Sequence, residues 1–108
     1  MSGSRRYTIR WTDLALEDLR TIRAYVARDD PAAARRLAGR LRAAVRRLAD
    51  HPLSGRKVPE MPGSGHREII VTPYRIVYTV LRRRAVILRV WLGSRHLGRP
   101  DAVADDEP

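Results

Sequence analysis

Two amphipathic stretches separated by a short break constrain the fold of this chain more than any other feature. In the first stretch, apolar side chains recur three or four positions apart: Ala15, Leu19, Ile22 and Val26. The second stretch repeats this spacing with Ala34, Leu37, Ala38, Leu41, Val45 and Leu48. Such spacing places apolar side chains on one face of an α-helix. The break, Asp29-Asp30-Pro31, supplies an N-cap and a proline suited to a first helical turn, so the pattern predicts a helical hairpin.

The sequence also marks the outer ends of this hairpin. Thr12 or Asp13 can cap the first helix, which we expect to begin near Leu14. The second helix is expected to end near Ala49, because His51-Pro52 follows and the residue before a proline disfavours helical geometry.

Strands are expected on both sides of the hairpin. Residues 7–11 alternate in polarity, and residues 67–72, 74–81 and 85–92 are rich in Val, Ile, Tyr and Thr. Glycine, serine and proline in residues 53–65 indicate a loop. We therefore predict an α+β fold in the order β-α-α-β-β-β, with the helical hairpin packed on one face of a small antiparallel sheet whose last three strands form a meander.

The length and charge of the chain suggest one basic domain with an acidic tail. Its 108 residues suit a single domain, which we place at residues 1–100. Residues 101–108 contain four acidic side chains and no basic one, and we expect this tail to be disordered, with shielding of the basic face as a sharper hypothesis. Without these four carboxylates the formal net charge rises from +10 to +14. Such a charge favours nucleic acid, a nucleoprotein enzyme or an acidic protein segment as partner.

Several classes of site and location are not expected. The chain has no cysteine, and its three histidines, at positions 51, 66 and 96, lack metal-ligand spacing. We therefore expect no metal and no cofactor. The residues before Tyr7 are not followed by a signal-like apolar core, and no apolar run approaches about 18 residues. We expect a cytoplasmic protein with no membrane partner.

Arginine positions in the expected strands point to a basic surface. Period-2 geometry puts Arg75 on the sheet face opposite Tyr74, Ile76, Tyr78 and Val80. Ile87, Arg89 and Trp91 should share one side, which Arg95 continues unless Gly93 introduces a bulge. If helices cover one face, the other can collect a set of arginines that bind a target or phosphates: Arg67, Arg75, Arg89 and Arg95. The alternative is that these arginines form ordinary ion pairs with Glu60 or Glu68.

A family resemblance runs through residues 7–96. Its helical part is Trp11-x-x-x-Ala15-x-x-Asp18-Leu19-x-x-Ile22-x-x-Tyr25, followed by Asp30-Pro31-x-Ala33-Ala34 and Leu48-x-x-x-Pro52-x-x-Gly55-Arg56. Its sheet part is Arg67-Glu68-Ile69, Tyr74-Arg75-Ile76-Val77-Tyr78 and Val90-Trp91-Leu92-Gly93-Ser94-Arg95. Taken together, these segments resemble the RelE/ParE superfamily of toxins from type II toxin–antitoxin systems, and the ParE branch in particular.

The resemblance implies a toxin that a cognate antitoxin wraps and neutralises, and whose complex reaches operator DNA indirectly through the antitoxin. ParE-like toxins bind DNA gyrase and trap it on cleaved DNA without covalent chemistry of their own. The helical hairpin and the missing nuclease groups favour this branch, for which target contact is expected on the basic face and at residues near the tail.

The alternative within the superfamily is a RelE-like, metal-independent endoribonuclease that cleaves ribosome-bound mRNA. Arg75 and Arg95 match arginines used in that branch, but no tyrosine follows Arg95 and the single lysine, Lys57, lies in the expected loop. A substitute set would pair Glu60 or Glu68 as base with His96 or His66 as acid. In that case the catalytic residues are Arg75, Arg95 and His96. A third reading is an inactive toxin that serves in a repressor complex.

Overall fold

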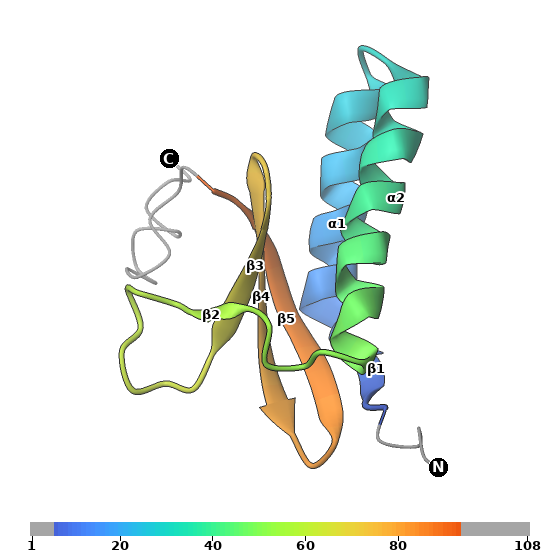
Figure 1. Ribbon diagram of the computed structural model, residues 1–108. Helices are drawn as coiled ribbons and strands as arrows, with labels where there is room; N and C mark the ends of the chain where they lie inside the picture. The colour runs from blue at the N-terminus through green and yellow to red at the C-terminus, as the bar shows by residue number, and fades with distance from the viewer. Residues whose placement is uncertain (1–5, 94–108) are drawn as a thin grey trace.

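The computed structural model describes residues 6–93, which form a helical hairpin packed against a twisted sheet (Figure 1). The helices are α1 (Asp13–Ala27) and α2 (Pro31–Arg46), and α2 continues into a 3₁₀ turn, η1 (Arg47–Ala49). The strands are β1 (Thr8–Trp11), β2 (Arg56–Lys57), β3 (Arg67–Val71), β4 (Tyr74–Leu81) and β5 (Arg84–Leu92). Within the described residues, neither helix is long and apolar enough to cross a membrane.

The five strands form one sheet in the order β1-β5-β4-β3-β2. The predicted α+β class and β-α-α-β-β-β order are confirmed, as is the antiparallel meander of β3, β4 and β5. The sheet is nevertheless mixed, because β1 pairs with β5 in parallel. The expected loop of residues 53–65 also contains β2, which pairs with the start of β3.

Local capping explains where the helices begin. The Thr12 hydroxyl accepts a hydrogen bond from the Ala15 backbone N–H at 3.1 Å, and the Asp30 carboxylate accepts one from the Ala33 N–H at 3.1 Å. Each bond satisfies an N–H group that has no partner inside its helix. Pro31 occupies the first turn of α2, as predicted.

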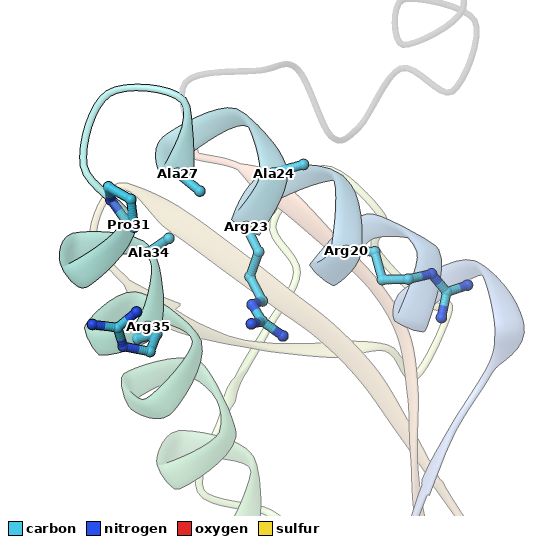
Figure 2. Close-up of a pocket in the computed structure, with 7 residues that line it drawn as sticks. All are labelled: Arg20, Arg23, Ala24, Ala27, Pro31, Ala34 and Arg35. Carbon is cyan, nitrogen blue, oxygen red and sulfur yellow. The ribbon is translucent and has the colours of Figure 1, made fainter.

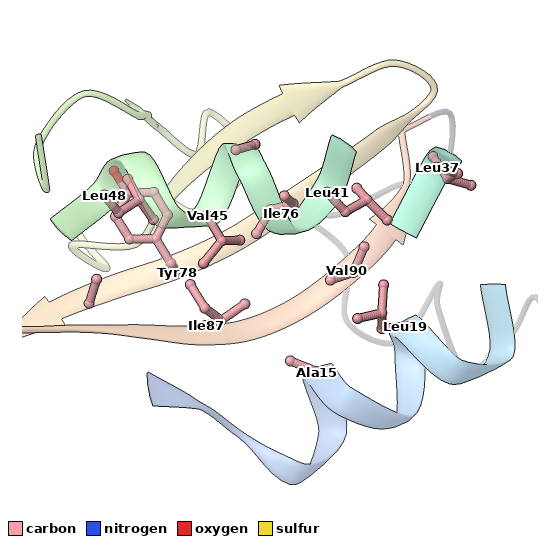
Figure 3. Packing of buried hydrophobic residues seen from close by; sticks show 12 residues of the cluster. Ala15, Leu19, Leu37, Leu41, Val45, Leu48, Ile76, Tyr78, Ile87 and Val90 are labelled. Carbon is pink, nitrogen blue, oxygen red and sulfur yellow. The ribbon is translucent and has the colours of Figure 1, made fainter. Parts of the chain in front are cut away.

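The main core lies between the hairpin and one face of the sheet (Figure 3). Leu41, Val45 and Leu48 of α2 and η1 pack towards β4 and β5, where Ile76, Tyr78, Ile87 and Val90 are buried. Ala15 and Leu19 of α1 belong to the same cluster, on the same face of the sheet. Both predicted apolar stripes are therefore core, and burial of this apolar surface fixes the hairpin on the sheet.

A β-bulge in β5 changes which side chains face the hairpin. Tyr78 pairs with Ile87, but the neighbouring Val77 pairs with Arg89, so Leu88 has no residue opposite it. The extra residue reverses the alternation of faces. Ile87 packs in the main core, whereas Trp91 packs on the other side of the sheet. The prediction that Ile87, Arg89 and Trp91 share one side is thus wrong for Ile87.

Candidate functional site

The sheet face away from the hairpin, here called the open face, is only partly open. Val58 and Val77 are buried there in a second small cluster, and Met61, Leu88 and Trp91 pack against it. The segment after β2 therefore covers part of the face that the sequence suggested would be a basic surface. The part of the open face that remains accessible lies around the charged side chains beside this cluster.

Arg75 lies at the centre of these charged side chains. It is opposite Ile70 of β3 and Trp91 of β5, and its side chain is only 9% exposed. Its Nε donates to Glu68 Oε1 at 2.9 Å, and its Nη2 lies 2.7 Å from the same oxygen. Nη1 and Nη2 donate to the Glu60 carboxylate at 3.2 and 2.9 Å. Every nitrogen of this guanidinium is therefore directed at a carboxylate.

A second arginine completes the group from the edge of the sheet. The fully buried Glu68 carboxylate accepts a bond from Arg56 Nε at 2.6 Å, and 61% of the Arg56 side chain is exposed. This pairing follows from the register of β2 and β3, in which Arg56 is opposite Glu68. We call Arg56, Glu60, Glu68 and Arg75 the arginine–carboxylate network. Its formal charges cancel, which is the condition under which buried charges are tolerated.

The hydrogen bonds of the network shift the pKa values of two members, Glu60 and Arg75. The hydrogen bond from Arg75 lowers the pKa of the Glu60 carboxyl, because it stabilises the ionised form. Burial acts to lower the pKa of Arg75, but hydrogen bonds to Glu60 and Glu68 outweigh it and raise that pKa. Both side chains are thus held in their charged forms.

An open pocket of about 420 Å³ lies next to the network. It is lined by the exposed side of β3, the β3–β4 turn and parts of the network: Arg56, Ile70, Thr72, Pro73, Tyr74, Arg75 and Gly93. An anion entering it would meet Arg56 as the accessible cation, since Arg75 is already bonded to two carboxylates. Arg75 also lines this pocket, but its guanidinium nitrogens are already bonded to Glu60 and Glu68, so an anion would have to compete with these carboxylates for them.

Arg89 is engaged by α1 rather than by the network. Its Nε and Nη2 donate to the Asp18 carboxylate at 2.8 and 3.0 Å, and Asp18 also accepts the backbone N–H of Val90 at 2.9 Å. The bond to Asp18 raises the pKa of Arg89. The Arg89 guanidinium lies 5.1 Å from the centre of the Trp91 ring, within range of a cation–π contact. The last residue of β5 that pairs with β1 is Ile87, because β1 ends at Trp11. The Val90 N–H therefore has no partner in β1, and Asp18 accepts its hydrogen bond instead.

Arg67 lies on the opposite face from Arg75. It is opposite Tyr78 in the β3–β4 register, and Tyr78 belongs to the main core. The Arg67 guanidinium donates to the backbone oxygens of Leu53 and Gly55 at 3.3 and 2.8 Å. Its contacts hold the chain between η1 and β2 in place.

Tyr78 fixes the same segment from inside the core. Its hydroxyl donates to the Pro52 carbonyl at 2.8 Å and accepts the Gly55 N–H at 2.9 Å. Burial raises the pKa of Tyr78, so it stays a neutral donor. A Cβ on Gly55 would lie 2.6 Å from the Tyr78 hydroxyl, so only glycine fits at this position without a shift. Tyr78 and Arg67 together therefore place Arg56 beside Glu68.

The structure thus separates the arginines that the sequence grouped. Arg75 and Arg89 both lie on the open face, but each is bonded to carboxylates, as the ion-pair alternative anticipated for Arg75. Arg67 lies on the other face, while Arg95 and His96 lie outside the described residues. Sequence reasoning did not identify Arg56 or Asp18 as partners, because both contacts depend on strand pairing or on packing between distant segments.

Comparison with known proteins agrees with this fold. Residues 9–97 match the family model described as the ParE toxin of the type II toxin–antitoxin system parDE. The Sinorhizobium fredii protein Y4kP, which is named as a toxin, is 43% identical over 81 residues, covering 71% of this chain and 79% of that protein. Toxin RelE2 of Caulobacter vibrioides is 39% identical over 90 residues, covering 82% of this chain and 93% of that protein.

A solved structure shares the architecture. A chain of the chromosomal ParDE toxin–antitoxin system from Pseudomonas aeruginosa superposes with a TM-score of 0.69 at 24% identity, over 82% of this chain and 98% of that one. At this identity the match shows the fold alone. The family match extends over nearly all of the described residues, and both relatives are named as toxins, so the chain belongs to the ParE toxin family of type II toxin–antitoxin systems, within the RelE/ParE superfamily.

Proposed function

We propose that this toxin inhibits growth by binding and poisoning DNA gyrase, and that a cognate antitoxin neutralises it in the cytoplasm. The observation that carries the proposal is the state of Arg75, the arginine in the described part of the chain that a ribonuclease of this superfamily would use. It is buried and bonded to two carboxylates. These bonds support a structural role for Arg75, which favours a toxin that acts by binding.

Cleavage of RNA by attack of a 2′-hydroxyl needs a base at that hydroxyl and cations around the phosphate. In this protein a phosphate would have to compete with Glu60 for the Arg75 nitrogens. Displacement of Glu60 would leave a carboxylate without its partner and would oppose phosphate binding through its charge. The network therefore holds Arg75 in a form unsuited to stabilising a phosphorane.

The carboxylates also fit poorly as general bases. The Glu68 side chain is fully buried between Arg56 and Arg75, so it cannot reach a substrate hydroxyl without unfolding the site. The pKa of Glu60 is lowered by its bond to Arg75, which makes it a weaker proton acceptor. Gyrase inhibition requires a binding surface and no proton transfer, so it makes no such demands on these residues.

The antitoxin is proposed as an acidic protein with a segment that folds onto the toxin. The sequence carries a formal net charge of +10, and the solved relative in a ParDE toxin–antitoxin system has the same fold. An acidic, partly disordered segment would gain electrostatic steering and burial of apolar surface, at an ordering cost of a few kcal/mol.

The RelE-like alternative is kept because a relative at 39% identity is named toxin RelE2. In that case the toxin would cleave mRNA on the ribosome, with Arg75, Arg95 and His96 as the first residues to test. Activity would then require Glu60 to leave Arg75 when the ribosome and mRNA bind.

Parallel assays distinguish the two activities. Purified toxin, with and without the protein encoded beside it, is tested for inhibition of gyrase supercoiling and for ribosome-dependent mRNA cleavage. The proposal expects trapped, cleaved DNA that the antitoxin prevents, and intact mRNA. A His96→Ala variant should retain gyrase inhibition, as should the matched control His51→Ala. Cleaved mRNA with normal supercoiling, and a loss of about 100-fold in cleavage for His96→Ala alone, would replace the proposal with the ribonuclease.

A further inference from the structure

The helical hairpin carries a concentration of arginine that the arginine–carboxylate network does not involve. Residues 31–49, which form α2 and η1, contain no acidic side chain and six arginines: Arg35, Arg36, Arg40, Arg42, Arg46 and Arg47. Arg35, Arg42 and Arg46 are seven and four residues apart, which places them on one stripe of the helix. The stripe extends over roughly 16 Å, the length along which one strand of B-DNA presents about five phosphates.

An open groove of about 520 Å³ lies between the two helices near the hairpin tip (Figure 2). Arg23 of α1 and Arg35 of α2 lie on its two sides, and Arg20 lies one turn before Arg23 on α1. The rest of the lining consists of short side chains: Ala24, Ala27, Pro31 and Ala34. Among the described residues that line the groove, none besides the arginines is larger than proline, so a polymer backbone can come close to these arginines.

With one exposed exception, the arginines of the groove and of the stripe lack acidic partners within the described residues. Across the residues that the structure describes, Arg23, Arg35, Arg42 and Arg46 form no ion pair. Arg20 pairs with Glu17, but both side chains are more than 60% exposed, and such a pair contributes little. The positive charge of the hairpin is therefore available to a ligand, whereas that of Arg75 is not.

The lining of the groove indicates the chemistry of its ligand. A helical protein partner would need pockets for large apolar anchors, and alanine and proline provide only a shallow floor. The exposed large apolar side chains of residues 6–93 are Leu14, Leu16, Tyr25, Leu53, Ile70 and Leu81, and none of them lines the groove. Phosphates need cations and close approach but no such pocket. A nucleic-acid backbone therefore fits these features better than an acidic protein does.

We propose that the hairpin groove and the Arg35–Arg42–Arg46 stripe bind the phosphate backbone of duplex DNA without sequence preference. This activity goes beyond the proposed function, since it requires neither gyrase nor an antitoxin. It uses the helical surface and leaves the open face of the sheet uncovered. A toxin held on DNA in this way would be concentrated where an enzyme that acts on DNA is found.

Binding of the full chain to a fluorescent duplex of about 20 base pairs, measured by anisotropy over a series of salt concentrations, tests the proposal. Each phosphate contact contributes about 0.9 to the slope of log K against log salt. The variant Arg23→Gln/Arg35→Gln should therefore lower the magnitude of this slope by about 2 and weaken binding at least 10-fold near 0.1 M salt. The control Arg10→Gln/Arg84→Gln removes the same charge from exposed positions in β1 and β5, and it should lower the slope by less than about 0.5.

Circular dichroism checks that both variants are folded, which is expected because all four positions are exposed. Equal losses in the two variants would overturn the proposal, because they would show that binding depends only on net charge. Unchanged binding in the hairpin variant would overturn it as well. Competition by polyglutamate that equals competition by unlabelled duplex, at matched charge, would replace DNA with an acidic protein as the ligand.

Discussion

The two arginine-rich regions of this toxin differ in what their charges do. On the open face of the sheet, Arg56 and Arg75 are bonded to Glu60 and Glu68 in a partly buried network. On the hairpin, arginines such as Arg35 are exposed and have no acidic partner among residues 6–93. We propose that the first group contributes to stability and that the second binds a ligand. Net charge alone therefore does not locate a binding surface, because burial and pairing decide which cations a ligand can reach.

The largest difference between the two regions is expected in the free energy of unfolding that is lost when an ion pair is broken. Glu68→Gln removes a fully buried negative charge, so Arg75 keeps only Glu60 as an anionic partner and Arg56 keeps none, and the protein should be destabilised by about 3 kcal/mol. Urea denaturation followed by circular dichroism measures the change. The matched control, Glu17→Gln, breaks an exposed pair in α1 and should cost less than about 0.5 kcal/mol. Similar costs for the two variants would mean that the network does not stabilise the fold.

A smaller loss is expected where α1 meets β5. Asp18→Asn removes the charge that binds Arg89 while keeping an oxygen that can accept the Val90 N–H, so it should cost about 1.5 kcal/mol. Asp13→Asn, an exposed change in the first turn of the same helix, should cost about 0.5 kcal/mol through the helix dipole. Thermal denaturation of both variants tests this difference. If Asp13→Asn proved the more costly change, the proposal that Asp18 stabilises the contact between α1 and β5 would be refuted.

The network should also make the stability of the protein weakly dependent on pH. The pKa of Glu60 is lowered from its ordinary value of 4.5 in the folded state, so its contribution to stability is present above that value and is lost as the pH falls through the folded pKa. The stability difference between wild type and Glu60→Gln should therefore shrink between about pH 6 and about pH 3. Because a third of the side chain is exposed (34%), the effect should stay below about 1 kcal/mol. A difference that grows on acidification would contradict this assignment.

Local signals explain how much of the fold could be predicted from the sequence. The predicted helix starts lie within a residue of those observed, because caps and apolar stripes are properties of neighbouring residues. The parallel pairing of β1 and the bulge at Leu88 were not predicted, because strand partners and register are set by packing between distant segments. One unanticipated residue in β5 was enough to put Ile87 and Arg89 on different faces.

The candidate site was predictable in part for the same reason. Glu60 and Glu68 are the only acidic residues between His51 and Gly93, so they were natural partners for an arginine in the last three strands. Which arginine they bind depends on register, and Arg56 joins the network only because β2 pairs with β3. Asp18 and Arg89 are 71 residues apart, and no local pattern connects them.

The smallest predicted effect is a gain in stability rather than a loss, and it concerns the hairpin. Arg42 and Arg46 are four residues apart on α2, and like charges at this spacing repel each other by a few tenths of a kcal/mol. Neither has an acidic partner in the described part of the chain, so neutralising one removes repulsion and breaks no ion pair. Arg42→Gln should therefore raise the free energy of unfolding by about 0.3 kcal/mol at low salt, and the gain should vanish at about 1 M salt, where repulsion is screened. Denaturation at both salt concentrations measures it. A loss of more than about 1 kcal/mol would mean that Arg42 stabilises the fold, and the contrast between a structural open face and an available hairpin surface would then fail at that position.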